Sequence, residues 1–182
     1  DGVVANTTLR KTKGGNGGNV QITFAWAVAV LIPALMFAPH GGAHFNPALT
    51  LGIAAIGGMP WAEVPGYIIS QILGGIFGGC LVYLFYRDHF DATEDKDVKL
   101  GVFCTGPAIR NYSSNFISEF IATFVLVFCI LAVPQTTHND PGGVGTFAVA
   151  AIILSCGMSL GGTTGYAINP ARDLGPRIAH AI

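Results

Sequence analysis

Long stretches without charged residues constrain this chain more than any other feature of its sequence. No Lys, Arg, Asp or Glu occurs in residues 14–62, 64–86, 120–139 or 141–171. A helix needs about 20 mostly apolar residues to cross a bilayer, and each of these runs is at least that long. One such run fits the core of a soluble protein, but four in 182 residues do not. The sequence therefore predicts a polytopic membrane protein of the all-α class.

The composition excludes several other classes. Charged residues make up 10% of the chain and the net charge is −1, whereas about 25% of the residues of an ordinary soluble domain are charged. There is no basic surplus to neutralise phosphates, so no nucleic-acid partner is expected. The four cysteines form no CxxC pair, so neither a metal site nor a cofactor is predicted. The expected partner is the lipid bilayer.

Four apolar segments are predicted to span the membrane as helices: residues 20–38, 64–86, 113–133 and 144–161. The second contains two overlapping GxxxG pairs, Gly74/Gly78 and Gly75/Gly79, which allow another helix to approach closely.

The polar segments between these helices are predicted to be loops. Residues 1–19 and 87–112 are read as loops, and residues 134–143 as a short turn.

A repeated motif lies in the two apolar stretches that glycine and proline interrupt. Residues 46–52 and 169–175 both read N-P-A-x-x-L-G, which indicates an internal duplication. Asn is a favoured N-cap and Pro suits the first helical position. Each copy therefore predicts a half-helix, over residues 46–56 and 169–178. Ten helical residues rise about 15 Å, half a bilayer, so two half-helices entering from opposite faces meet near the midplane.

Such a meeting point predicts a path for a neutral solute. Half-helices at corresponding places in two repeats are a known indication of a transport site. Each N-terminus carries roughly half a positive charge, and together they oppose cations and protons. With the side-chain oxygens of Asn46 and Asn169 engaged in capping, their NH₂ groups are expected to donate to a passing solute.

Residues 42–48 (GAHFNPA) and 169–177 (NPARDLGPR) resemble the major intrinsic protein family of aquaporins and glycerol facilitators. The resemblance covers the whole chain and includes Pro47 and Ala48 with their counterparts Pro170 and Ala171. It implies inverted repeats with six spans and two half-helices, in a homotetramer with one pore per subunit in the cell membrane. It further implies that this chain begins after the first span and lacks the last one.

The resemblance also implies which residues select the solute. Asp173, directly after NPA-Arg, is typical of the glycerol-conducting branch. Trp26, Gly157, Tyr166 and Arg172 match the positions of the family's narrow filter. Gly157 is expected to leave room for the Trp26 ring, while Arg172 donates to hydroxyls opposite an apolar corner. Tyr166 replaces the more frequent Phe.

Two further residues are given supporting roles by the resemblance. Glu119 is expected to accept hydrogen bonds from backbone amides of the second half-helix loop. His44 is expected beside the pore, where its carbonyl lines the path.

The expected function is passive passage of glycerol, related small uncharged solutes and some water, with ions and protons excluded and no enzymatic step. A water-selective aquaporin is the nearest alternative, and an ion-coupled secondary transporter is a more distant one. A membrane protease is a third, because Gly157, Ser159 and Gly161 match G-x-S-x-G, although no predicted span supplies a His.

The charge distribution and the resemblance predict opposite orientations. Seven of the nine Lys and Arg residues lie in residues 1–19 and 87–112. The positive-inside rule places those segments in the cytoplasm, whereas the family resemblance places them outside. We follow the resemblance, but the sequence alone leaves the orientation open.

Overall fold

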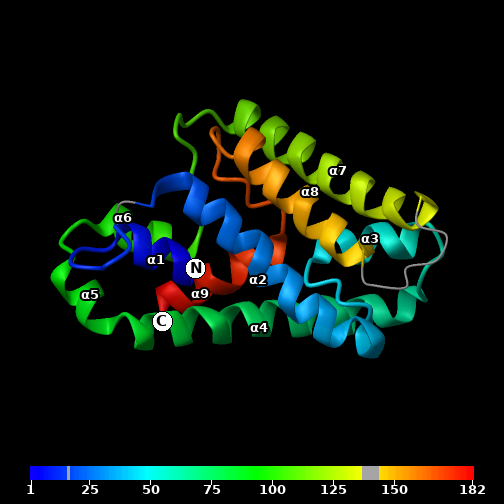
Figure 1. The fold of residues 1–182 in the computed structure, drawn as a ribbon, viewed down its shortest axis with the longest axis horizontal. Helices are drawn as coiled ribbons and strands as arrows, with labels where there is room; N and C mark the ends of the chain where they lie inside the picture. The colour runs from blue at the N-terminus through cyan, green and yellow to red at the C-terminus, as the bar shows by residue number, and fades with distance from the viewer. Residues whose placement is uncertain (16, 137–143) are drawn as a thin grey trace.

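The computed structural model describes residues 1–15, 17–136 and 144–182, and this part of the chain is helical with no strand. Figure 1 shows the helices in chain order. They are α1 (Gly2–Thr8), α2 (Gly18–Gly41), α3 (Pro47–Ala55), the 3₁₀ turn η1 (Trp61–Glu63), α4 (Val64–Phe85), α5 (Arg87–Ala92), α6 (Lys96–Phe103), α7 (Tyr112–Thr136), α8 (Val144–Leu160) and α9 (Pro170–Ala181).

Among the described residues, three segments are long and apolar enough to cross a bilayer. These are α2, η1 with α4 (Trp61–Phe85), and Tyr112–Val133 of α7, with mean hydropathies of 2.1, 1.9 and 2.6. Only 6% of the most apolar part of Trp61–Phe85 is buried within the chain. Because apolar surface of this extent is unfavourable in water, these helices require lipid or another apolar partner around them. The fourth apolar helix, α8, is shorter and packs against α2 and α7.

The helix boundaries lie close to the apolar segments of the sequence. The helices expected over 20–38 and 113–133 extend further, to Gly18–Gly41 and Tyr112–Thr136. Residues 134–136 of the turn expected over 134–143 are therefore helical, and residues 137–143 lie outside the described residues.

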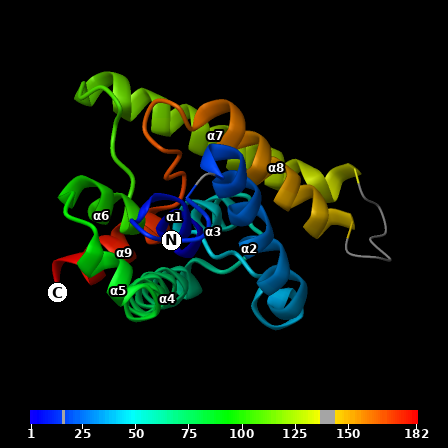
Figure 2. The same ribbon diagram turned by 60° about the vertical axis from the view of Figure 1, so that its left-hand side comes forward.

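The two short helices α3 and α9 begin directly after the NPA asparagines. Helix α9 ends at Ala181, three residues beyond the expected boundary. The two half-helices contact each other, and α9 packs along α4 while α3 packs against α4 and α7 (Figures 1 and 2). The half-helices are therefore held between the long helices.

The expectation that residues 1–19 and 87–112 are loops is wrong in part, because α1, α5 and α6 form there. Apolar residues on these short helices make a small core of their own, whose buried members are Ala5, Leu9, Phe90, Val102, Phe103 and Cys104. These helices are six to eight residues long, too short to show a clear helical spacing of apolar residues in the sequence. Figure 1 shows these helices gathered at one end of the molecule.

One of the two GxxxG pairs forms the contact between α4 and α9. A Cβ atom added at Gly75 would lie 2.7 Å from the Ala171 carbonyl oxygen, and one added at Gly79 would lie 2.9 Å from Ala179 Cβ. At Gly74 and Gly78 an added Cβ would meet nothing within 4 Å among the described residues. Backbone-to-backbone contact through Gly75 therefore fixes the position of α9.

Replacing Gly75 with Ala is expected to destabilise the protein by about 1–3 kcal/mol, because the added methyl group overpacks this contact. The matched control is Gly66→Ala in the first turn of α4, where an added Cβ meets nothing within 4 Å and the higher helix propensity of Ala adds up to about 1 kcal/mol. The midpoint of thermal unfolding in detergent should fall for Gly75→Ala alone. Equal midpoints for the two variants would contradict the close contact.

Candidate functional site

The NPA asparagines cap their helices in the same way. Asn46 Oδ1 accepts a hydrogen bond from the Ala48 amide at 2.9 Å, and Asn169 Oδ1 accepts from the Ala171 amide at 3.1 Å. Both asparagines are extended, and each is followed by proline at the first helical position. Side-chain capping satisfies amides that the first turn of a helix leaves without a partner.

The side-chain nitrogens of the same asparagines join the two repeats. Asn46 Nδ2 donates to the Ile168 carbonyl oxygen at 2.8 Å, and Asn169 Nδ2 donates to the Phe45 carbonyl oxygen at 2.8 Å. Each acceptor belongs to the residue that precedes the other asparagine. We call this pair the reciprocal asparagine bonds. One hydrogen of each NH₂ group is used in these bonds, so one hydrogen of each remains for the expected donation to a solute.

The loops before both half-helices have the same unusual backbone. Ala43 and Phe45 have φ of 49° and 50°, and Tyr166 and Ile168, at the corresponding positions of the second repeat, have φ of 42° and 39°. Positive φ is uncommon for residues other than glycine and costs most for a β-branched residue such as Ile168. The sequence carried no signal for this conformation beyond the repeated motif. The reciprocal asparagine bonds hold both loops in it.

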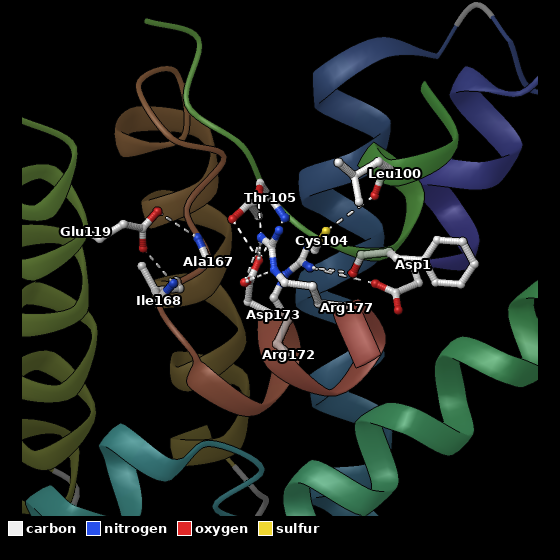
Figure 3. A network of polar contacts seen from close by, with 11 residues as sticks. Asp1, Leu100, Cys104, Thr105, Glu119, Ala167, Ile168, Arg172, Asp173 and Arg177 are labelled. Carbon is white, nitrogen blue, oxygen red and sulfur yellow. Dashed lines mark hydrogen bonds and ion pairs between the residues drawn. The ribbon is translucent and has the colours of Figure 1, made fainter. Parts of the chain in front are cut away.

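Glu119, on α7, holds the second loop from the side. Its Oε1 accepts from the Ala167 amide and its Oε2 from the Ile168 amide, both at 3.0 Å (Figure 3). Both carboxylate oxygens are therefore engaged by backbone donors, which are strong partners for an ionised acceptor.

The four residues that the sequence analysis assigned to the filter lie on three helices and one loop. The guanidinium carbon of Arg172, on α9, lies 4.2 Å from the centre of the Trp26 ring on α2, at cation–π distance. Tyr166 precedes α9 and is 8% exposed. Trp26 Nε1 and Tyr166 Oη are buried without a hydrogen-bond partner in the described part of the chain. We call Trp26, Gly157, Tyr166 and Arg172 the filter cluster.

Gly157 lies in close contact with Thr23 and Tyr166. A Cβ atom added there would lie 2.8 Å from Thr23 Cγ2 and 3.0 Å from the Tyr166 ring. The absence of a side chain at Gly157 therefore makes room for the Tyr166 ring. That it also leaves room for the Trp26 ring stays a prediction.

Arg172 and Asp173 point to different partners (Figure 3). Arg172 Nη1 lies 3.5 Å from the Phe103 carbonyl oxygen and 3.8 Å from Asp1 Oδ1. Asp173 Oδ1 accepts from the amide and hydroxyl of Thr105 at 2.8 and 3.0 Å, and Asp173 forms an ion pair with Arg177 at 2.9 Å. Asp173 therefore fastens α9 to the segment after α6, while Arg172 faces the filter. Sequence reasoning missed Asp1, Phe103 and Thr105.

His44 belongs to a hydrogen-bonded group at the start of α3. Its Nδ1 lies 3.2 Å from Thr50 Oγ1, which also accepts from Gln71 Nε2 at 3.0 Å and donates to the Asn46 carbonyl oxygen at 3.1 Å. The His44 ring packs on Tyr67 with 4.8 Å between ring centres. These contacts tie the first loop to α4.

A cavity of about 1080 Å³ lies against both NPA asparagines and part of the filter cluster. Its wall includes His44, Asn46, Asn169, Trp26 and Arg172 among mostly apolar side chains. The cavity therefore offers apolar walls with a few polar groups at the half-helix junction and at the filter cluster, an arrangement typical of sites for small amphipathic molecules.

Comparisons with known proteins agree with this geometry. The family profile described as "Major intrinsic protein" matches residues 2–181. The chain is 52% identical over its full length to a probable glycerol uptake facilitator protein from Thermotoga maritima, of which it covers 77%. It is likewise 52% identical over its full length to glycerol uptake facilitator protein 3 from Lactiplantibacillus plantarum, of which it covers 75%.

A solved structure shares the fold. The aquaglyceroporin from Plasmodium falciparum superimposes with a TM-score of 0.83 and 30% identity, over 97% of this chain and 72% of that one. Because the profile spans nearly all 182 residues and full-length identity reaches 52%, this all-α, multi-pass membrane chain belongs to the major intrinsic protein family.

Proposed function

We propose that this chain forms a passive channel for glycerol and related small uncharged solutes, with some water passing as well. The observation that carries this proposal is the filter cluster, where the Arg172 guanidinium lies 4.2 Å from the centre of the Trp26 ring in the wall of a mostly apolar cavity. The relatives named as glycerol uptake facilitators support the same solute class. Transport of this kind needs no chemical step.

The filter cluster is proposed to recognise the two faces of a polyol separately. The rings of Trp26 and Tyr166 provide apolar surface for the carbon chain, while Arg172 donates hydrogen bonds to the hydroxyl oxygens. Trp26 Nε1 and Tyr166 Oη lack protein partners among the described residues, and an unpartnered buried polar group is costly. A solute hydroxyl that bonds to them removes this cost.

The half-helix junction is proposed to exclude cations and protons. The N-termini of α3 and α9 meet there, and the partial positive charges of both helices point at the same place. The remaining hydrogen of each asparagine NH₂ group is available to a passing hydroxyl or water oxygen. The site therefore presents donors, which suit a neutral solute and oppose a cation.

The alternatives fit the geometry less well. Trp26 and Gly157 at the filter positions, rather than a small aromatic residue and His, favour a polyol over a strictly water-selective pore. An ion-coupled transporter with broken helices is expected to carry acidic residues for ion coupling within its spans, and the one acidic residue within the predicted spans, Glu119, has both oxygens occupied by backbone amides. Assembly as a homotetramer remains a prediction of the family resemblance.

Gly157→Ala tests the filter assignment. The added methyl group contacts the Tyr166 ring and displaces it into the path, so the ratio of glycerol to water permeability should fall about tenfold, given an overpacking cost of about 1–3 kcal/mol. The measurement is stopped-flow light scattering on vesicles that contain the intact protein. The control is Gly162→Ala, where an added Cβ meets nothing within 4 Å. Water flux without glycerol flux in the unsubstituted protein would reject the polyol channel.

Glu119→Gln tests the support of the second loop. A glutamine accepts through one oxygen and turns its NH₂ group towards one of the two amides, so we expect a loss of about 2–3 kcal/mol. The thermal midpoint in detergent should fall. Glycerol and water permeability should decrease together, because both solutes pass the second loop. The exposed Glu63→Gln should leave all three quantities unchanged. A selective loss of glycerol flux alone would show that Glu119 acts on the solute instead.

A further inference from the structure

The carboxylate of Asp1 lies in the wall of the cavity beside Arg172 (Figure 3). Its side chain is 10% exposed, and its Oδ1 has no hydrogen-bond partner among the described residues. Burying an ionised carboxylate is costly unless a charge or a hydrogen bond compensates for it. The Arg172 guanidinium, whose Nη1 lies 3.8 Å from Asp1 Oδ1, supplies a compensating charge.

The distance between these two groups leaves space for a third. At 3.8 Å the nitrogen and oxygen are too far apart for an ordinary N–H···O hydrogen bond, which measures about 2.7–3.2 Å. A hydroxyl oxygen can lie at hydrogen-bond distance from both atoms, accept from Arg172 and donate its own hydrogen to Asp1. The pair therefore matches the two hydrogen-bonding functions of one alcohol group.

The rest of the filter cluster lacks an acceptor of this strength. A guanidinium and an indole N–H only donate, and a tyrosine hydroxyl is a neutral acceptor. The neighbouring carboxylate of Asp173 is occupied by Thr105 and Arg177. Asp1 Oδ1 is thus a carboxyl oxygen beside Arg172 that forms no hydrogen bond with the described residues.

We propose that Asp1 is a fifth solute-binding residue of the filter, whose carboxylate accepts the hydroxyl hydrogen of a polyol while Arg172 donates to the same hydroxyl oxygen. This inference rests on the proposed polyol channel and adds a specificity residue to it. It predicts a preference for solutes with hydroxyl hydrogens. Water depends less on this acceptor, because a water molecule in the filter keeps water neighbours on either side.

The test compares Asp1→Asn and Asp1→Glu in the intact protein, reconstituted in vesicles and measured by stopped-flow light scattering with glycerol and with water. Asparagine keeps the shape but offers a neutral acceptor, so the ratio of glycerol to water permeability should fall about fivefold. Glutamate keeps the charge and should retain a clearly higher ratio than asparagine. The control is Asp91→Asn, an exposed carboxylate on α5, which should not change the ratio.

The outcomes separate this proposal from the proposed function. An unchanged ratio in Asp1→Asn overturns the role of Asp1, and so does a proportional loss of both permeabilities, which indicates a purely structural contribution. Equal ratios for Asp1→Asn and Asp1→Glu also overturn it, because the charge then does not matter. Absence of glycerol flux in the unsubstituted protein contradicts the channel proposal itself.

Discussion

The reciprocal asparagine bonds are the interaction on which the rest of this structure depends. Asn46 and Asn169 each cap one half-helix with the side-chain oxygen and bind the opposite loop with the side-chain nitrogen. Inside a bilayer, non-helical backbone is tolerated only where protein or a water-filled cavity surrounds it. The two asparagines surround the loop backbone with protein at the place where both half-helices begin. Their side-chain nitrogens also set the distance between the two repeats.

Around this centre, buried polar groups are divided between those that hold the backbone and those that remain open. Glu119 and Asp173 are bonded to backbone groups and neighbouring side chains, and fix the second loop and α9. Trp26 Nε1, Tyr166 Oη and Asp1 Oδ1 have no hydrogen-bond partner among the described residues, and they belong to side chains that line the cavity near Arg172. The bonded carboxylates therefore hold the loop and α9 in place, while the unpartnered polar atoms near Arg172 remain for hydrogen bonds to a hydroxylated solute.

The sequence predicted the features that local residue patterns determine. It missed the features that depend on contacts between segments far apart in the chain. Charge-free runs predicted the long helices, and the repeated Asn-Pro predicted the half-helices, because apolar length and N-capping are visible in the chain itself. The destination of the asparagine NH₂ groups, the left-handed backbone at Ile168 and the space that Gly157 leaves for Tyr166 depend on contacts between distant segments. Helices α1, α5 and α6 were missed because they are short and carry few apolar residues, among charges in α5 and α6, and tertiary packing supports them.

A double-substitution cycle on Asn46→Ala and Asn169→Ala tests the central claim most directly, with the thermal stability of the intact protein in detergent as the readout. Each single change removes one cap and one bond between the repeats. If the bonds hold the two loops together reciprocally, the first substitution already loosens the partner bond, so the double variant should lose less stability than the sum of the single losses, by at least about 0.5 kcal/mol. Strict additivity would mean that the asparagines act as two independent caps, and would contradict the account.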